Sequence, residues 1–296
     1  MPKYHEAPIP NVADAIKEGK RIYYYRMSHP CNADLKKMYG SYTPQMVTTN
    51  ELNQILKLRY FITPGSSFLG TCGSGEQALF AYLFGAKNNV FFDISYNAYW
   101  LTCLKIGAIK AFDKHTEYEN FVQKLKENCG PAGSLLKVPN IWHVLTYLTD
   151  VQVKYLELMD GARMPVVVRN GTCQFFDITQ TDYDILKQSV EMPIPFIRTD
   201  IRNLDEKLGE DKFDNVYYSN ILCWVEPYEV EPILEKTKKC IKPGGRLFLM
   251  ADCVSFDNML TAAINVYSGS EWDVVFLPKD DDIYQIIVQR AQSRSY

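Results

Sequence analysis

From residue 66 onward, short apolar runs alternate with amphipathic segments along the chain. The pattern predicts strands over 66–71 and 89–94, followed by helices over 75–85 and 97–112. A strand, a helix and a second strand in this order are typical of a parallel sheet with a right-handed crossover. The sequence therefore predicts an α/β fold.

The alternation stops over residues 113–180. This segment holds helical patterns at 117–128 and 139–158 and a short apolar run at 165–168. An insertion between the second and third strands of a nucleotide-binding sheet commonly supplies a lid or an acceptor pocket, because ligands bind at the carboxyl ends of those strands. An outgrowth with a purely structural role is the alternative.

The alternation then resumes and continues to the end of the chain. Lys242-Pro-Gly-Gly245 is expected to form a turn in which proline ends a helix and glycine takes a positive φ. The last two apolar runs are expected to pair as an antiparallel hairpin. The predicted elements are a helix at 182–190, strands at 195–199 and 215–219, a helix at 230–241, a strand at 246–251 and the hairpin strands at 272–277 and 284–290.

The first sixty residues have a different pattern. Helical periodicity at 11–18 and 49–60 flanks a polar stretch that is rich in tyrosine. We interpret residues 1–60 as an N-terminal helical cap and residues 61–296 as one Rossmann-like domain, with the insertion at about 113–180.

Composition and charge exclude several classes of protein. The 296 residues are 47% hydrophobic and 23% charged with a net charge of −3, so no basic excess favours nucleic acid as a partner. The eight cysteines include no C-x-x-C pair, which argues against a zinc site and a disulfide framework. The sequence shows neither a signal-peptide pattern nor a long charge-free apolar run. We expect a metal-free cytoplasmic protein without stable membrane association.

A glycine-rich turn follows the first predicted strand of the domain. Gly70-Thr-Cys-Gly73-Ser-Gly75 lies between this strand and a helix, and Asp93 ends the next apolar run. Such a turn lets backbone N–H groups approach a ligand, and an acid about 20 residues further on can accept hydrogen bonds from ribose hydroxyls. Dinucleotide enzymes and methyltransferases share this pattern. The turn therefore predicts a nucleoside-bearing cofactor without identifying it.

Later motifs narrow the choice of cofactor. Thr199-Asp200-Ile201 follows the third predicted strand, and Ser219-Asn220 follows the fourth. This order resembles class I S-adenosylmethionine-dependent transferases, in which the acid after the second strand binds ribose and the acid after the third binds adenine. Segments 71–83, 92–98, 104–111 and 219–224 further resemble the diacylglyceryl-homoserine synthase (BtaA-like) family of 3-amino-3-carboxypropyl transferases. The resemblance covers roughly residues 60–252.

The resemblance implies a Rossmann-like class I methyltransferase fold, a mostly parallel seven-stranded sheet that ends in an antiparallel hairpin. It also implies S-adenosyl-L-methionine as the donor substrate. For Asp93 and Asp200, a role as the N-cap of a helix is the alternative to ligand binding. The cofactor-binding residues that we expect are Gly70, Cys72, Gly73, Gly75, Gln77, Asp93, Ile94, Asp200, Ile201 and Ser219.

Transfer from a sulfonium requires little acid catalysis, because its leaving group is a neutral thioether. Alignment of the reacting atoms, worth roughly 7–11 kcal/mol in favourable systems, can supply most of the acceleration. Candidates for facing the reacting carbon are Ser219, Asn220 and Trp224 after the fourth strand, with Tyr25 closing over them. A turn-capping Asn220, a buried Trp224 and a solvated Tyr25 are the alternatives.

These expectations lead to a function with several open alternatives. The leading hypothesis is transfer of the 3-amino-3-carboxypropyl group to a small-molecule nucleophile, or intramolecular cyclisation of that group, with release of methylthioadenosine. A methyltransferase that releases S-adenosylhomocysteine is the second hypothesis, and a noncatalytic cofactor-binding module is the third. The sequence does not identify the acceptor, the general base or the oligomeric state.

Overall fold

The computed structural model describes residues 4, 45–46, 52–128, 133–161, 167–168, 178–252, 256–280 and 283–292. The chain divides into two compact units that alternate along the sequence. Unit 1 comprises Met1–Asn50, Cys72–Leu83 and Asp93–Arg198, and unit 2 comprises Glu51–Thr71, Phe84–Phe92 and Thr199–Tyr296. The boundaries proposed for an N-terminal cap stay a prediction, because most of residues 1–50 lies outside the described ranges.

Seven strands form one sheet in the order β5-β3-β2-β6-β7-β9-β8. β2 pairs in parallel with β3 and β6, β6 pairs in parallel with β7, and β9 is antiparallel to both β7 and β8. This arrangement confirms the predicted Rossmann-like methyltransferase fold with its C-terminal antiparallel hairpin. The strands are β2 (Ser67–Thr71), β3 (Lys87–Asp93), β5 (Phe196–Arg198), β6 (Phe213–Tyr218), β7 (Ile241–Asp252), β8 (Trp272–Asp280) and β9 (Ile283–Arg290). A separate parallel pair joins β1 (Gln45–Met46) to β4 (Val167–Val168).

The central strand β2 is buried along its whole length and β6 along most of it, which explains their apolar runs. Every residue of β2 is buried, and the Phe68 ring packs against the rings of Phe91 and Tyr217 on the two neighbouring strands. Leu247 and Val288 are fully buried further along the sheet. Burial of this apolar surface is the main stabilising contribution to the sheet.

The amino ends of β2, β6 and β7 are joined by polar side chains. Ser67 Oγ donates to Asp214 Oδ2 at 2.7 Å, and Lys242 Nζ donates to the same oxygen at 2.9 Å. Burial opposes ionisation of Asp214, but the hydrogen bonds from Lys242 and Ser67 outweigh it and lower the pKa of the carboxyl. This cluster fixes the register at the start of three central strands.

The predicted Lys242-Pro-Gly-Gly245 turn is a bulge inside β7 rather than a loop before it. Gly244 has the expected positive φ of 77°, and the pairing with β6 shifts between Phe213 and Asn215 to accommodate the extra residues. The strand predicted to begin at 246 therefore begins at Ile241.

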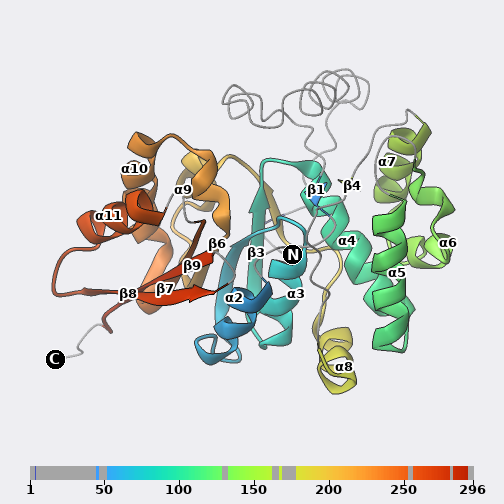
Figure 1. Ribbon diagram of the computed structural model, residues 1–296, viewed down its shortest axis with the longest axis horizontal. Coiled ribbons are helices and arrows are strands. Elements are labelled where there is room, and N and C mark those ends of the chain that lie inside the picture. The colour runs from blue at the N-terminus through green and yellow to red at the C-terminus, as the bar shows by residue number, and fades with distance from the viewer. Residues whose placement is uncertain are drawn as a thin grey trace. The chain divides into compact units, whose positions relative to one another are not determined.

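Unit 2 also contains helices α2 (Leu52–Lys57), α9 (Leu204–Leu208), α10 (Pro227–Thr237) and α11 (Phe256–Val266). α10 and α11 lie side by side (Figure 1). α10 begins three residues before its predicted start, with a proline in its first turn and a capping box in which Glu226 and Glu229 bind each other's backbone N–H. The 3-10 helices of unit 2 are η2 (Leu58–Tyr60), η4 (Ile201–Asn203), η5 (Asn220–Trp224) and η6 (Lys238–Cys240).

The described part of unit 1 is mostly helical, with β1, β4 and β5 as short strands, and α4 packs against several of its helices. The first fourteen residues of α4 are all buried, and the helix contacts α5, α6 and α8. A helix that is buried on all sides shows no amphipathic stripe. None of the helices in the described ranges has the length and apolar character that spanning a bilayer requires. The helices are α3 (Glu76–Leu83), α4 (Tyr96–Ala111), α5 (His115–Glu127), α6 (Ile141–Leu145), α7 (Asp150–Gly161) and α8 (Gln180–Ser189), with the 3-10 helix η3 (Leu135–Lys137).

The helix predicted over 139–158 is two helices, α6 and α7. Thr149 N donates to Gln152 Oε1 at 2.9 Å, and Gln152 N donates to Thr149 Oγ1 at 3.3 Å. These reciprocal bonds form a capping box that starts α7. The T-x-x-Q pattern at 149–152 was the sequence signal for this break.

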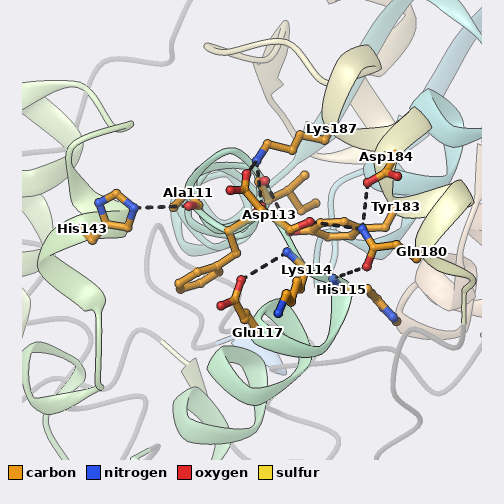
Figure 2. A network of polar contacts seen from close by, with 12 residues as sticks. Ala111, Asp113, Lys114, His115, Glu117, His143, Gln180, Tyr183, Asp184 and Lys187 are labelled. Carbon is orange, nitrogen blue, oxygen red and sulfur yellow. Dashed lines mark hydrogen bonds and ion pairs between the residues drawn. The ribbon is translucent and has the colours of Figure 1, made fainter.

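Polar side chains of α8 satisfy backbone groups where α4 ends and α5 begins (Figure 2). Tyr183 Oη donates to the carbonyls of Ile109 and Phe112, both at 3.3 Å, and Lys187 Nζ donates to the Phe112 carbonyl at 2.9 Å. Gln180 Oε1 accepts the N–H of His115 at 2.9 Å. α8 therefore supplies the capping groups that two other helix ends need.

Replacing the buried Tyr183 with phenylalanine should lower the free energy of unfolding by about 1–3 kcal/mol, because the Ile109 carbonyl loses this partner while the ring remains. Urea denaturation followed by circular dichroism measures the change. Ser189→Ala on the same helix removes an exposed hydroxyl bond and should cost less. Equal stability of the Phe variant and the wild type would contradict a capping role for the hydroxyl.

Candidate functional site

Two glycines shape the turn between β2 and α3. Gly73 has φ 51° and Gly75 has φ 96°, in the left-handed region that side chains disfavour. A Cβ at Gly75 would lie 3.2 Å from the Cα of Thr102 on α4, so this glycine also lets the turn pack closely on that helix. Both positions therefore need glycine, and the turn is held against α4 within unit 1.

The Asp93 carboxylate joins this turn to the turn that follows β3. Asp93 Oδ2 accepts the N–H of Gly73 at 3.1 Å, and Oδ1 accepts the N–H of Ser95 at 2.9 Å. The N-cap of α4 is Ser95, whose hydroxyl accepts the N–H of Asn97. The alternative that Asp93 caps this helix is therefore wrong.

The environment of Asp93 raises the pKa of its carboxyl toward neutral pH. Burial raises the pKa of the carboxyl to about 6, although hydrogen bonds from the backbone of Ser95, Gly73 and Ile94 favour the charged form. Each backbone donor occupies one lone pair of an oxygen, and a carboxylate offers about four such sites. With three of these sites taken by the backbone, Asp93 can accept one further hydrogen bond from a ligand at pH 7.

A buried ion pair lies behind the turn. The Lys105 ammonium is fully buried and pairs with the buried carboxylate of Glu76. Lys105 Nζ also donates to the carbonyl of Ser74 at 2.8 Å, and the Ser74 hydroxyl donates to Glu76. Lys105 thus holds the backbone of the turn and the first residue of α3 together. Sequence reasoning missed this role, although a lysine inside an otherwise apolar helix was a signal for it.

Cys72 and Gln77 take different positions around the same turn. The Cys72 thiol is buried, and its Sγ lies 3.3 Å from Thr102 Oγ1; burial raises the pKa of the thiol. The Gln77 amide lies against Gly73, and its Oε1 is buried with no hydrogen-bond partner among the residues that the structure describes. An unpaired buried acceptor is costly, so this oxygen is suited to receive a donor from a ligand.

In unit 2, Gly70 lies inside β2 and pairs in register with Phe91 and Tyr217. A Cβ at this position would lie 2.5 Å from the Phe68 ring. Packing of the Phe68 ring therefore explains why residue 70 is glycine. The close approach of the Gly70 backbone to a ligand stays a prediction.

Asp200 caps the 3-10 helix η4. Its Oδ1 accepts the N–H of Arg202 at 2.9 Å, and its Oδ2 accepts Arg202 Nη1 at 2.8 Å. The N-cap alternative is therefore present in the structure, and the adenine-binding role stays a prediction. Ile201 is buried as the first residue of η4. In unit 1, Ile94 is partly exposed, and its carbonyl accepts Arg198 Nε at 3.3 Å.

The candidates for chemistry follow β6. Ser219 is buried at the N-cap position of η5, and Asn220 is partly exposed as the first residue of that helix. Because β6 and β7 are parallel neighbours, both residues lie at the carboxyl edge of the sheet. Tyr25 and the side chain of Trp224 lie outside the described residues. Within the described ranges, no group of three or more His, Cys, Asp or Glu residues is placed to hold a metal ion.

Each of the two units, taken by itself, contains some of the candidates. In unit 1 the structure brings together Cys72, Gly73, Gly75, Gln77 and Asp93 around one turn. In unit 2 it places Asp200 beside Arg202, a residue that sequence reasoning did not select. Arg202 lies only two positions after Asp200, so a contact between them is local. Its second partner, Glu229, is 27 positions away, and no local pattern indicates that contact.

Comparison with solved structures finds low-identity neighbours. The N-methyltransferase NodS from Bradyrhizobium japonicum in complex with S-adenosyl-L-homocysteine is 11% identical, with a TM-score of 0.44, and the match covers 91% of this chain and 98% of that chain. An rRNA methylase from Streptococcus thermophilus is 11% identical, with a TM-score of 0.42 and coverage of 83% and 99%. A ribosomal protein L11 methylase from Lactobacillus delbrueckii subsp. bulgaricus is 11% identical, with a TM-score of 0.40 and coverage of 83% and 81%.

No curated protein matches the sequence. One protein-family model does match it, over residues 161–249, a segment that runs from the end of α7 to the central part of β7. The family of that model is described as "Methyltransferase domain". Residues 161–249 are thus similar to a methyltransferase domain, in agreement with the strand order of the sheet.

Proposed function

We propose that this protein binds S-adenosyl-L-methionine and transfers one of the groups on its sulfonium to a small-molecule nucleophile. The observation that carries the proposal is the arrangement of Asp93 and the glycine turn in unit 1. A carboxylate that is fixed by Gly73 and Ser95 N–H groups, at the end of the second strand of this fold, is suited to accept a hydrogen bond from a ribose hydroxyl. The unpaired Gln77 Oε1 is suited to the ammonium of the donor.

Methyl transfer is the first candidate for the reaction, and the similarity of residues 161–249 to a methyltransferase domain supports it. A nucleophile attacks the methyl carbon, the carbon–sulfur bond breaks, and its electron pair stays on sulfur. The products are the methylated acceptor, S-adenosylhomocysteine and a proton. Because the leaving group is a neutral thioether, the residues of the protein need only align the acceptor and receive this proton.

Transfer of the 3-amino-3-carboxypropyl group is the second candidate. The resemblance of segments 71–83, 92–98, 104–111 and 219–224 to aminocarboxypropyl transferases supports it. Here the nucleophile attacks the γ-carbon of the methionine arm, and the thioether that leaves is methylthioadenosine. Attack by the amine of the donor itself would give a cyclic product without an acceptor.

The identity of the thioether product distinguishes these reactions. Purified protein is incubated with S-adenosylmethionine, alone and with a panel of amines, thiols and alcohols, and the products are identified by liquid chromatography and mass spectrometry. S-adenosylhomocysteine indicates methyl transfer, and methylthioadenosine above the rate of spontaneous breakdown indicates the second candidate. Binding without turnover would favour a noncatalytic module. Calorimetry that detects no binding of S-adenosylmethionine, S-adenosylhomocysteine or methylthioadenosine would overturn the proposal.

A further inference from the structure

Asp200 is tied to helix α10 by a single arginine. Arg202 Nη1 donates to Asp200 Oδ2, Nε donates to Glu229 Oε1 and Nη2 donates to Glu229 Oε2, each at 2.8 Å. All three residues belong to unit 2. The Arg202–Glu229 pair is bidentate, the geometry in which a guanidinium and a carboxylate fix each other's orientation.

Both ends of Arg202 are held by α10. Glu229 is the third residue of that helix, and its Oε2 also accepts the N–H of Glu226 at 2.9 Å in the capping box. Lys236 Nζ, two turns further along, donates to the carbonyl of Arg202 at 2.7 Å. The hydrogen bonds from Arg202 lower the pKa of Glu229 to about 2, so the pair is charged throughout the neutral range. An isolated surface ion pair contributes little to stability, whereas a bidentate pair within a network of charges holds its side chains in fixed positions.

The consequence for Asp200 is a fixed carboxylate plane. The backbone N–H of Arg202 occupies a lone pair on one oxygen, and Nη1 of the same residue occupies a lone pair on the other. The remaining lone pairs of the carboxylate can only accept hydrogen bonds. An exocyclic amino group can donate to such a site, whereas a 6-oxo group is repelled by it.

We propose that Arg202, held by Glu229, is a positioning residue that fixes the Asp200 carboxylate as acceptor for the exocyclic amino group of adenine and so selects 6-aminopurine over 6-oxopurine ligands. This inference rests on the proposed function, because it requires an adenosyl ligand. The selectivity comes from orientation: a carboxylate that is already immobilised loses less conformational entropy when the base binds.

The test compares two ligands that differ only at position 6 of the purine, methylthioadenosine and methylthioinosine. Calorimetry gives the dissociation constant of each for the wild-type protein and its variants. We expect the wild type to prefer methylthioadenosine by about ten- to a hundredfold, as for loss of one hydrogen bond to a charged group. Glu229→Gln releases the guanidinium, and it should lower this preference by about two- to tenfold.

Two further variants sharpen the comparison. Arg202→Lys keeps the positive charge but cannot bind Glu229 at two points and Asp200 at a third, so it should not restore the preference that Arg202→Ala loses. Glu235→Gln is the matched control, because Glu235 lies on the same helix but pairs with Lys238 at 3.0 Å. It takes no part in the bonds that link Arg202 to Asp200 and Glu229. This control should keep the wild-type ratio.

The outcomes separate this inference from the proposed function. If the Arg202 and Glu229 variants bind both ligands more weakly by the same factor, the ratio of the two dissociation constants is unchanged. The network is then only structural and the inference is wrong. A wild type that binds the two purines equally also overturns it but leaves the transferase proposal in place. A wild type that binds neither ligand, nor S-adenosylmethionine, overturns both.

Discussion

Replacing Lys105 with methionine is expected to lower the free energy of unfolding by about 3–5 kcal/mol at neutral pH. The substitution leaves the Glu76 carboxylate buried without its cation, and both side chains are almost completely inaccessible in the native protein. The Ser74 carbonyl also loses the Lys105 ammonium as a donor. The turn that carries Gly73 and Gly75 is therefore expected to loosen as stability falls.

Chemical denaturation of the variant, followed by circular dichroism, measures this loss. Lys124→Met is the matched control, because Lys124 pairs with Glu127 on the surface of α5 with both side chains about half exposed. Such a pair contributes about 0.2–1 kcal/mol. In Glu76→Gln/Lys105→Met neither charge remains, so most of the stability should return. A single Lys105→Met substitution that costs no more than Lys124→Met would show that the buried pair is unimportant.

Replacing Asp93 with asparagine is expected to weaken the binding of S-adenosylhomocysteine by about 10–150-fold, which corresponds to loss of about 1.5–3 kcal/mol from a hydrogen bond to a charged group. The variant should also lose the pH dependence of binding. The pKa of Asp93 is about 6 in the folded protein, so the wild-type carboxylate becomes protonated as the pH falls through 6. A neutral carboxyl is a weaker acceptor, and the affinity of the wild type should therefore decrease toward pH 5.

Isothermal titration calorimetry between pH 5 and pH 8 measures both effects, with Asp273→Asn, an exposed position on β8, as the control. Stability should change in the opposite direction. A pKa that is raised from 3.8 on folding gives a stabilising contribution that is complete below 3.8 and is lost as the pH rises through 6. If the folded Asn variant binds as tightly as the wild type at pH 7, Asp93 has no part in ribose recognition.

The elements of the fold that the sequence predicted well are those specified by local pattern. β2, α3, β3 and α4 each begin and end within about three residues of their predicted limits, because apolar runs and breakers such as Gly73 and Gly85 mark them. The hairpin of β8 and β9 was predicted for the same reason. The helix α11 was not predicted from the sequence. Its apolar residues Met259, Ala263 and Val266 nevertheless recur with helical spacing and lie on one buried face.

The parts that were missed depend on contacts between distant residues. Lys105 and Glu76 are 29 positions apart, and Arg202 and Glu229 are 27 apart, so neither pair shows a local charge pattern. The sequence allowed either of two residues to cap α4. Ser95 is the cap, but Asp93, two residues earlier, is of a type that caps helices equally well. Only the geometry of the turn distinguishes them.

The alternation of the two units along the chain determines how this protein can be divided. The backbone passes from one unit to the other five times, at residues 50, 71, 83, 92 and 198. No continuous fragment can contain one unit complete without including part of the other. Ser67 and Asp214, which join two central strands, are separated by 147 positions, so their contact closes a long loop. Folding is therefore expected to be slow and cooperative over the whole chain rather than sequential from one terminus.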